Sequence, residues 1–381
     1  MPRLRMVLGL SAVVLSAFGA YACSSDDANP TTGDDGGVDS QTPDPIPTED
    51  ADVTPIGDGG TGDGGVPAAC LGNPLSADGG GEVLTFDAGI AREIAKGSFL
   101  YGPQWTDEQG GQILYSESFL QVVSQNGADG GALQVFRQTG NTALLPLQNA
   151  SKDGFLYTAA SYLPGPGGAI LRTSLDGGAA PVSFPVEAGV YSPNGIAVSK
   201  KGFIYFTDPG FQMGNAFIRT GLYRMQEDGG GVIVPVNQFG TGTAAPGDRI
   251  TGIAFNKDET ALYVAFFDAQ KFFRYSVDAN GVASAPVALP FKPAGNPVGL
   301  AIDEGGNIWV AENTPAGATS GLVEVLDPTG TKNWATIPFP TARPTGVAFG
   351  GADRTTVFVT TERYVAEGSL YVMKTRCNGL L

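Results

Sequence analysis

The segment S-P-N-G-I-A-V-S-K-K-G-F-I-Y-F-T-D, residues 192–208, decides the fold of this chain of 381 residues. A short apolar run, a Lys-Lys-Gly turn and an aromatic run predict two antiparallel strands joined by a tight turn. Five other segments repeat this pattern, and each has one key position followed by a small residue. The key positions are 101, 149, 194, 251, 298 and 345.

The spacing of these repeats predicts the architecture. The steps between key positions are 48, 45, 57, 47 and 47 residues, and helical periodicity is almost absent. A second recurring motif follows each hairpin and often ends in an Asp-Gly turn, as in residues 170–178. Such a turn indicates a second hairpin, which gives four strands per unit. Repeats of this length built from strands are typical of a β-propeller. We therefore predict an all-β, six-bladed β-propeller over residues 81–381, whose sixth blade is closed by the segment Gly81–Asp87.

Composition excludes several classes of function. The chain has no His, so Ser-His-Asp and Cys-His nucleophiles and His-ligated zinc are ruled out. Its net charge of -16 belongs mainly to residues 24–80, which hold 12 acids and no Lys or Arg. Residues 81–381 carry 20 basic against 26 acidic residues, so no basic surface for nucleic acid is expected.

The N-terminal residues predict export. Arg3 and Arg5 precede an apolar run that is short for a membrane span, and Ala20-Tyr21-Ala22 offers a cleavage site. Residues 1–22 thus resemble a bacterial lipoprotein signal, with Cys23 as the lipidated residue. A plain secretory signal is the alternative. Lipidation would anchor the protein in the cell envelope without spanning it, and Ser24 and Ser25 favour the outer membrane.

Residues 23–80 are rich in Asp, Gly and Pro and poor in apolar residues, which predicts a disordered tether. Two cysteines flank the predicted propeller, Cys70 before it and Cys377 near its end. Oxidising conditions outside the cytoplasm favour a disulfide between them, which would tie the two ends of the fold together. Two free thiols are the alternative.

The predicted fold places the candidate site. The first strand of each blade is innermost, so the residue that begins it faces the mouth of the central channel. We expect this mouth ring to consist of Tyr101, Asn149, Asn194, Thr251, Val298 and Thr345. The second strands return to the same face, where we expect an outer ring of Glu117, Asp208, Glu312 and Glu362. Acids at strand ends are also commonly solvated or cap turns.

These motifs resemble the regucalcin/gluconolactonase family of six-bladed propellers, which are calcium-dependent hydrolases of sugar lactones and related esters. The likeness rests on residues 192–209, on Y-G-P-Q-W at 101–105, on V-G-L-A-I-D-E-G-G-N-I-W-V-A-E at 298–312 and on T-G-V-A-F-G-G at 345–351. It covers nearly all of residues 81–381.

The resemblance implies a divalent cation at the channel mouth, held by a Glu, by Asn residues and by an Asp. Those positions fall on Tyr101, on Asn194 and Thr251, and on Val298, so only Asn194 keeps the family's ligand type. Calcium prefers six to eight oxygens that include carboxylates. Calcium or another divalent cation at Asn194 is therefore a minor expectation, beside a turn residue or a contact to an organic ligand.

Two functions follow as hypotheses. The first is a monomeric, non-hydrolytic envelope propeller that binds a small molecule, a glycan or a protein at the channel mouth. The second is an active lactone or ester hydrolase whose cation site has moved to the outer acids. A scaffold in envelope assembly is a third reading, because propellers serve many unrelated functions.

Overall fold

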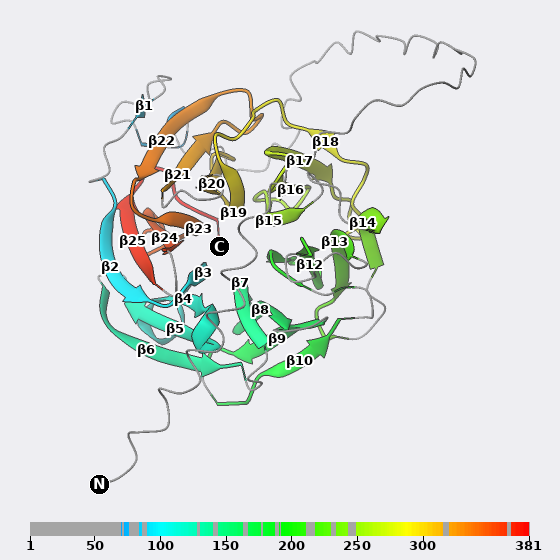
Figure 1. Ribbon diagram of the computed structural model, residues 1–381, viewed down its shortest axis with the longest axis horizontal. Coiled ribbons are helices and arrows are strands. Elements are labelled where there is room, and N and C mark those ends of the chain that lie inside the picture. Colours follow the sequence, from blue (N-terminus) through cyan, green and yellow to red (C-terminus); the bar gives the residue numbers. More distant parts are fainter. Residues whose placement is uncertain are drawn as a thin grey trace, which may run out of the picture. The chain divides into compact units, whose positions relative to one another are not determined.

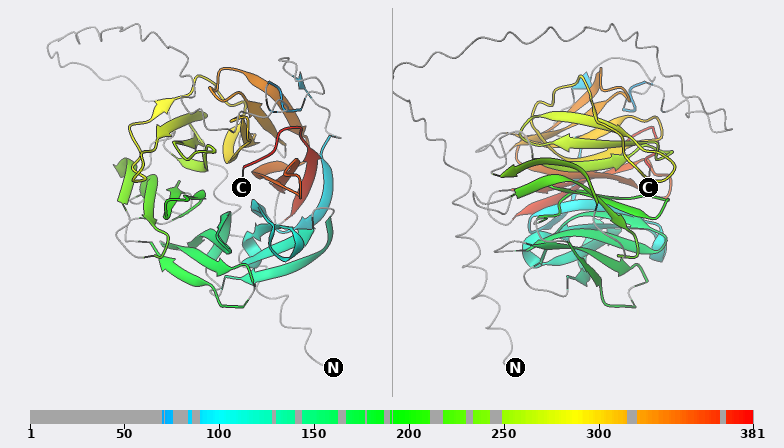
Figure 2. Two further views of the ribbon diagram at one scale, coloured as in Figure 1. Left: turned by 180° about the vertical axis from the view of Figure 1, so that it is seen from behind. Right: turned by 90° about the vertical axis from the view of Figure 1, so that its right-hand side faces the viewer.

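The computed structural model describes residue 70, residues 72–75 and 84–85, and residues 90–380 except 128–129, 140–143, 163–166, 177, 187–189, 191, 211–217, 230–233, 243–248, 315–319 and 364–366. It confirms the predicted six-bladed all-β propeller: six sheets surround a central axis (Figures 1 and 2). The predicted signal segment, Cys23 and nearly all of the 23–80 tether lie outside the described residues.

Consecutive strands build the first four blades, each counted outward from the axis. Blade 1 contains β3 (Leu100–Thr106), β4 (Gln112–Glu117), β5 (Val122–Gly127) and β6 (Gly130–Gln138), with the 3-10 turns η2 (Glu108–Gly110) and η3 (Ser118–Leu120). Blade 2 contains β7 (Leu144–Lys152), β8 (Phe155–Tyr162), β9 (Gly168–Ser174) and β10 (Val182–Pro185). Blade 3 contains β11 (Ile196–Val198), β12 (Phe203–Asp208), β13 (Ile218–Gln226) and β14 (Val234–Gly242). Blade 4 contains β15 (Ile250–Phe255), β16 (Ala261–Phe266), β17 (Lys271–Ser276) and β18 (Val287–Ala288).

The last two blades also use N-terminal strands. Blade 5 contains β19 (Asn296–Ile302), β20 (Ile308–Asn313), β21 (Gly321–Leu326) and β22 (Asn333–Phe339), and β1 (Leu84–Thr85) adds a parallel fifth strand at its outer edge. Blade 6 contains β23 (Arg343–Gly350), β24 (Thr356–Glu362) and β25 (Gly368–Lys374), and β2 (Arg92–Gly97) completes it by pairing with β25.

The closing strand is therefore a correction. The segment Gly81–Asp87 was expected to close blade 6, but its residues Leu84–Thr85 pair with blade 5, and Arg92–Gly97 closes the ring. The outermost strand of a blade has one edge in solvent, where charged side chains are favoured. Arg92, Glu93 and Lys96 suit that position. Because these charged residues interrupt any apolar run, the strand could not be predicted from the hydrophobic pattern.

The hydrophobic core lies between neighbouring blades. Alternate residues of each strand face the two adjacent blades, and the second strands carry the largest buried side chains, among them Trp309, Tyr115, Tyr157, Tyr205 and Phe358. Trp309 of blade 5 packs edge-on against Phe349 of blade 6 at 5.4 Å between ring centroids. Because the strands of a blade cannot bury both faces alone, the blades are stable only as a ring.

The predicted disulfide Cys70–Cys377 is confirmed, with 4.6 Å between the two Cα atoms. Both cysteines are buried. The C-terminal segment beyond Cys377 then runs to the centre of the ring (Figure 1), where its backbone bonds to blades 5 and 6. The disulfide thus fixes the N-terminal edge of the domain to the tail at its axis.

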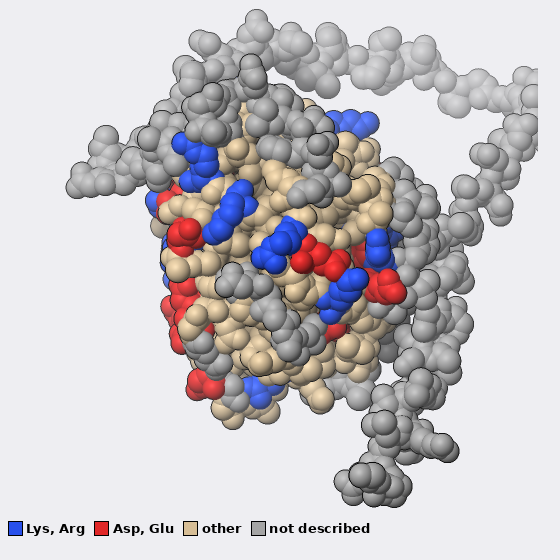
Figure 3. Space-filling view, turned by 90° about the vertical axis from the view of Figure 1, so that its left-hand side faces the viewer, with Lys and Arg blue, Asp and Glu red and all other residues tan. Residues whose placement is uncertain are grey.

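On the side of the ring that β2 borders, the described residues form no patch of a single sign of charge. Basic and acidic side chains are interspersed there among uncharged residues (Figure 3). Among the described residues, no helix is long and apolar enough to cross a membrane.

Candidate functional site

Close backbone packing joins the inner strands at the level of the six predicted mouth residues, and their role as a binding site stays a prediction. The residue after the mouth position is Gly in five blades, namely Gly102, Gly195, Gly252, Gly299 and Gly346. A Cβ at any of them would collide with, or lie 3.0 Å or less from, atoms of the inner strand of the next blade. In blade 2, where Ala150 follows Asn149, the contact is the hydrogen bond from Gln148 N to Asn194 O at 3.3 Å. The inner strands therefore close on one another at the level of the mouth.

Tyr101 stands where the resemblance implies a metal-binding Glu, and it is fully engaged. Its hydroxyl donates to Glu362 Oε2 at 2.7 Å, and Arg343 pairs with the other oxygen of the same carboxylate. Burial, reinforced by the negative charge of Glu362, raises the pKa of Tyr101 well above its ordinary value. The phenol thus stays neutral, and Glu362 is neutralised by a cation.

Three other mouth residues are either hydrogen-bonded within the protein or apolar. Thr251 donates to the carbonyl of Pro297 at 2.7 Å, and Thr345 donates to the carbonyl of Leu100. Val298 is an apolar residue with 5% exposure. These positions offer a bound cation neither a carboxylate nor an uncommitted amide.

Asn149 is satisfied at both ends of its amide. Its nitrogen donates to the carbonyl of Gly102 at 2.7 Å and to Ser116 Oγ at 3.0 Å, and its oxygen accepts from Thr158 at 2.6 Å. It links blades 1 and 2, and both its amide nitrogen and its amide oxygen are hydrogen-bonded within the protein. We therefore assign it to the scaffold of the ring.

Asn194 differs from the other five mouth residues. Its backbone N–H donates to Thr207 O at 2.8 Å, and its carbonyl accepts from Gln148 N. Its side-chain Oδ1 is buried and accepts no hydrogen bond from the described residues. A buried amide oxygen without a donor is uncommon, because leaving it unpaired costs about 1–3 kcal/mol. Asn194 is thus the mouth residue with an acceptor available for a ligand.

The outer-ring acids are buried and hold backbone N–H groups at the mouth. Glu117 accepts from Ser98 N at 3.0 Å and from the Ser124 hydroxyl. Asp208 accepts from the backbone N–H groups of Ser192 at 3.2 Å and of Gly210 at 2.8 Å. The turn-capping interpretation of these acids is the one that the contacts favour.

Glu312 belongs to a pair that the sequence did not suggest. It accepts from Gly295 N at 2.7 Å, and Glu324 of the next strand is its carboxyl neighbour. Burial, with the adjacent carboxylate, raises the pKa of Glu312 well above its ordinary value, and burial also raises the pKa of Glu324. Glu312 Oε1 and Glu324 Oε2 have no other hydrogen-bond partner among the described residues. One proton shared between the two groups satisfies both oxygens.

The residues at the mouth do not fit the divalent cation that the family resemblance implies. Of the four carried-over positions only Asn194 presents an unpaired oxygen, and the nearest carboxylate, Glu362, is tied to Tyr101 and Arg343. No group of three or more His, Cys, Asp or Glu side chains with metal-ligand placement occurs within the described part of the chain. Calcium needs more oxygens and more negative charge than this arrangement supplies.

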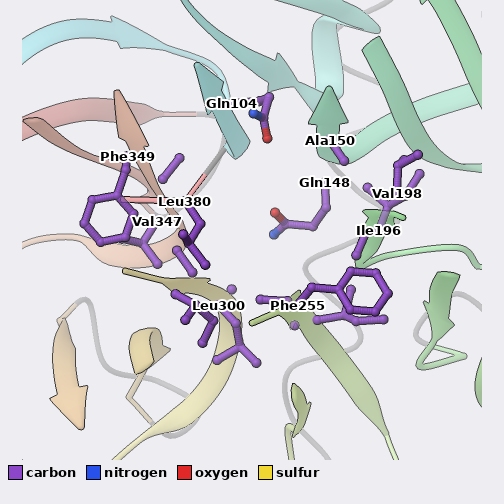
Figure 4. A pocket seen from close by; sticks show the side chains of 18 of the residues that line it. Gln104, Gln148, Ala150, Ile196, Val198, Phe255, Leu300, Val347, Phe349 and Leu380 are labelled. Atoms are coloured by element: carbon purple, nitrogen blue, oxygen red, sulfur yellow. The ribbon is translucent and has the colours of Figure 1, made fainter. Parts of the chain in front are cut away.

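The channel below the mouth ring contains a cavity of about 420 Å³. Inner-strand residues of all six blades line it, and its wall combines apolar and polar side chains (Figure 4). Of the predicted mouth residues only Asn149 borders it. Sequence reasoning missed this cavity, because its lining residues follow the mouth positions by one to several residues and meet only in the closed ring.

Comparison with known proteins agrees with this architecture. The sequence model of the family described as SMP-30/Gluconolactonase/LRE-like region matches residues 102–363. The chain is 32% identical over 152 residues to the pentonolactonase of Haloferax volcanii, covering 39% of this chain and 47% of that protein. It is 31% identical over 137 residues to the gluconolactonase of Zymomonas mobilis, covering 32% of this chain and 36% of that protein. The matched region thus spans about half of the first relative and about a third of the second.

Solved structures are similar in fold. Regucalcin of Agrobacterium tumefaciens, described as a calcium-binding protein, superimposes with a TM-score of 0.60 at 15% identity, over 78% of this chain and 97% of that chain. A gluconolactonase of Xanthomonas campestris gives a TM-score of 0.58 at 22% identity, over 75% of this chain and 91% of that chain. At these identities the likeness supports the propeller alone.

Proposed function

This chain belongs to the SMP-30/gluconolactonase/LRE-like family, and we propose that it uses the family propeller to bind a ligand without metal-dependent hydrolysis. The observation that carries the proposal is the state of the mouth. Tyr101, Thr251 and Val298 replace the ligands that the family resemblance implies, and the two polar ones are bonded to the protein itself. The mouth therefore lacks the negative charge that a divalent cation requires.

The loss affects both parts of the hydrolytic chemistry. A bound cation would polarise the lactone carbonyl, and a carboxylate at the mouth would serve as the base for water. Here the acids that reach the mouth face accept hydrogen bonds from backbone amides or pair with Arg343. None of them has both an open position and a neighbouring cation site. Binding is the activity that survives these replacements.

Asn194 is the residue that we assign to ligand contact at the mouth. Its Oδ1 is an acceptor without a donor, held at a fixed position by two backbone hydrogen bonds of the same residue. An acceptor of this kind favours a ligand with hydroxyl or N–H groups, such as a sugar or a peptide. We infer from the N-terminal residues that the protein is exported and lipid-anchored through Cys23, so such ligands would be met in the cell envelope.

Lactone hydrolysis is the second candidate, and the named relatives favour it, since two of them are lactonases. The two functions separate in one assay. We would incubate the chain beginning at Ser24 with glucono-1,5-lactone and with a pentonolactone, with calcium or with a chelator, and measure acid release. The binding proposal predicts the same rate as the buffer blank in both conditions. Turnover that calcium supports and the chelator abolishes would establish the hydrolase instead.

A matched variant asks whether the site can be restored. The double change Tyr101→Glu with Val298→Asp returns the two carboxylates that the family resemblance implies. If the mouth still has the family's shape, the variant gains calcium-dependent lactone hydrolysis over the parent chain. Calcium binding without hydrolysis by the variant would mean that the substrate pocket has changed as well.

A further inference from the structure

We propose that the channel beneath the mouth ring is a second binding site, for a small uncharged molecule that combines an apolar body with a hydroxyl or N–H group. The site goes beyond the proposed mouth function, because the cavity of about 420 Å³ includes Asn149 alone of the six mouth residues. A cavity of this size is in the usual range for small-molecule sites.

The wall of the cavity combines apolar and polar surface. Apolar residues of blades 3 to 6 and of the C-terminal segment line part of it (Figure 4): Ile196, Val198, Phe255, Leu300, Val347, Phe349 and Leu380. Burial of an apolar ligand surface against these apolar residues is favourable by about 25 cal/mol per Å². The body of the ligand is therefore apolar.

Two amides give the cavity its polarity. Gln104 donates from Nε2 to the carbonyl of Trp105 at 3.1 Å and to Ser151 Oγ at 3.0 Å, and Gln148 donates from Nε2 to the carbonyl of Thr345 at 2.9 Å. Because carbonyl oxygens can only accept, these contacts fix which end of each amide is nitrogen.

The oxygens of both amides are consequently turned to the cavity. Gln148 is 8% exposed, and neither Gln104 Oε1 nor Gln148 Oε1 accepts a hydrogen bond from a described residue. Figure 4 shows both side chains directed into the channel. Two acceptors on the cavity wall favour a ligand that donates hydrogen bonds, since leaving a buried acceptor unpaired is costly.

The charged side chains that line the cavity are Lys200, Lys257, Glu259, Glu304 and Arg354. Lys257 pairs with Glu304 at 3.8 Å, and Glu259 accepts from Ser199 and from the backbone of Lys200. Arg354 pairs with Asp107 at 3.8 Å, and Lys200 Nζ donates to the carbonyl of Lys257 at 3.4 Å, so each charged side chain of the lining already has a partner within the protein. An ionic ligand would lose its hydration there without gaining a partner, so the ligand is neutral.

Access is from the face opposite the mouth. At the mouth, the glycine contacts close the ring, and the bond between Gln148 and the Thr345 carbonyl joins blade 2 to blade 6. On the opposite face the C-terminal segment covers blades 5 and 6, through Gly379 N to Arg354 O at 3.0 Å and Leu380 N to Ile302 O at 3.2 Å. Among the described residues this segment bonds only to blades 5 and 6, so we place the entry beside the inner strands of blades 2 to 4.

The test uses three probes with the same aromatic body. We would titrate the chain beginning at Ser24 with 2-naphthol, with naphthalene and with 2-naphthalenesulfonate by calorimetry. The proposal predicts saturable binding of one 2-naphthol per chain, at least fivefold weaker binding of naphthalene, and no measurable binding of the sulfonate. Absence of saturable 2-naphthol binding, or preference for the sulfonate, would overturn the proposal.

Two variants locate the binding. Val198→Phe fills the chamber, and Val287→Phe makes the same change at a side chain that is 66% exposed on the outer strand of blade 4. We expect Val198→Phe to weaken 2-naphthol binding at least tenfold and Val287→Phe to leave it unchanged. Gln148→Leu should weaken 2-naphthol about fivefold while leaving naphthalene unaffected.

Equal 2-naphthol affinity in the two Phe variants would place the probe elsewhere and end the proposal. If Val198→Phe does not fold, the affinities of the Gln148→Leu chain for 2-naphthol and for naphthalene decide whether the probe binds in the cavity. The lactone-hydrolysis and calcium experiments on the mouth do not affect these titrations. The proposal for the mouth and the proposal for the cavity can therefore be refuted separately.

Discussion

Gly299→Ala tests the close packing that forms the mouth ring. An added Cβ would lie 2.7 Å from Gly346 Cα and 3.0 Å from Thr345 O, which are backbone atoms of the next blade. Ordinary carbon–carbon contacts are about 3.5–4.0 Å, so the inner strands of blades 5 and 6 must separate by about 1 Å. No side-chain rotation can relieve this contact.

The magnitude follows from two contributions. Overpacking of this kind costs about 1–3 kcal/mol. Displacement of Thr345 also weakens its buried bond to Gln148, which contributes about 1 kcal/mol. A loss of about 2–4 kcal/mol in the free energy of unfolding corresponds to about 3–6 °C for roughly 300 ordered residues.

The assay is thermal unfolding followed by circular dichroism and calorimetry, with Gly202→Ala as the control. Gly202 has a φ of +84° and no atom within 4 Å of an added Cβ, so the control carries backbone strain of about 1–2 kcal/mol without a collision. We expect a decrease of about 2–3 °C for the control and a larger one for Gly299→Ala. An unchanged melting temperature for Gly299→Ala, or one above that of the control, would refute the packing argument.

Two further predictions concern the closure and blade 5. The Cys70–Cys377 bond closes a loop with a sequence separation of 307. Reduction should therefore lower the free energy of unfolding by up to about 5.7 kcal/mol, which lowers the melting temperature by about 9 °C. A Cys377→Ser variant should have this lower melting temperature with or without reductant, whereas a parent chain whose melting temperature does not change with reductant would contradict the prediction. Burial raises the pKa of Asp303 from 3.8 to about 6 and that of Glu312 well above 4.5. Both groups bind a proton more tightly in the folded state, so their contribution to the free energy of unfolding is complete below about pH 4 and is lost as pH rises through the folded pKa values. Asp303 alone contributes about 3 kcal/mol. The melting temperature should fall between pH 5 and pH 8, and Glu312→Gln should reduce that fall; an equal fall in the variant would exclude the acid pair as a cause.

The blade repeat was readable from sequence because each blade uses the same hairpin and the same small residue after the mouth position. The closing strand was not, since Arg92–Gly97 is a charged edge strand without an apolar run. Its identity depends on pairing with β25, which lies about 280 residues away in the chain.

The site was predictable only in part. The sequence predicts, through its resemblance to the family pattern, that positions 101, 251 and 298 lack the expected ligands, and this stays a prediction. The buried state of the outer acids could not, because it depends on backbone N–H groups such as Ser98 and Gly295 that approach only in the folded ring. The pairing of Glu312 with Glu324 likewise needs the register of two neighbouring strands.

The cavity in the channel could not be predicted from the sequence. Its apolar residues are ordinary inner-strand residues when read one blade at a time. Six separate strands and the C-terminal segment bring them together, and Gln104 and Gln148 acquire meaning only when their amide nitrogens are seen to be satisfied.

The central claim is that the mouth no longer holds a divalent cation, and a calcium titration of the melting temperature tests it most directly. A site saturated at 100 times its Kd would add about 2.7 kcal/mol, or about 4 °C. The account predicts that the chain beginning at Ser24 melts at the same temperature, within 1 °C, in millimolar calcium and in chelator. A saturable rise of several degrees that the Asn194→Ala variant loses would contradict it.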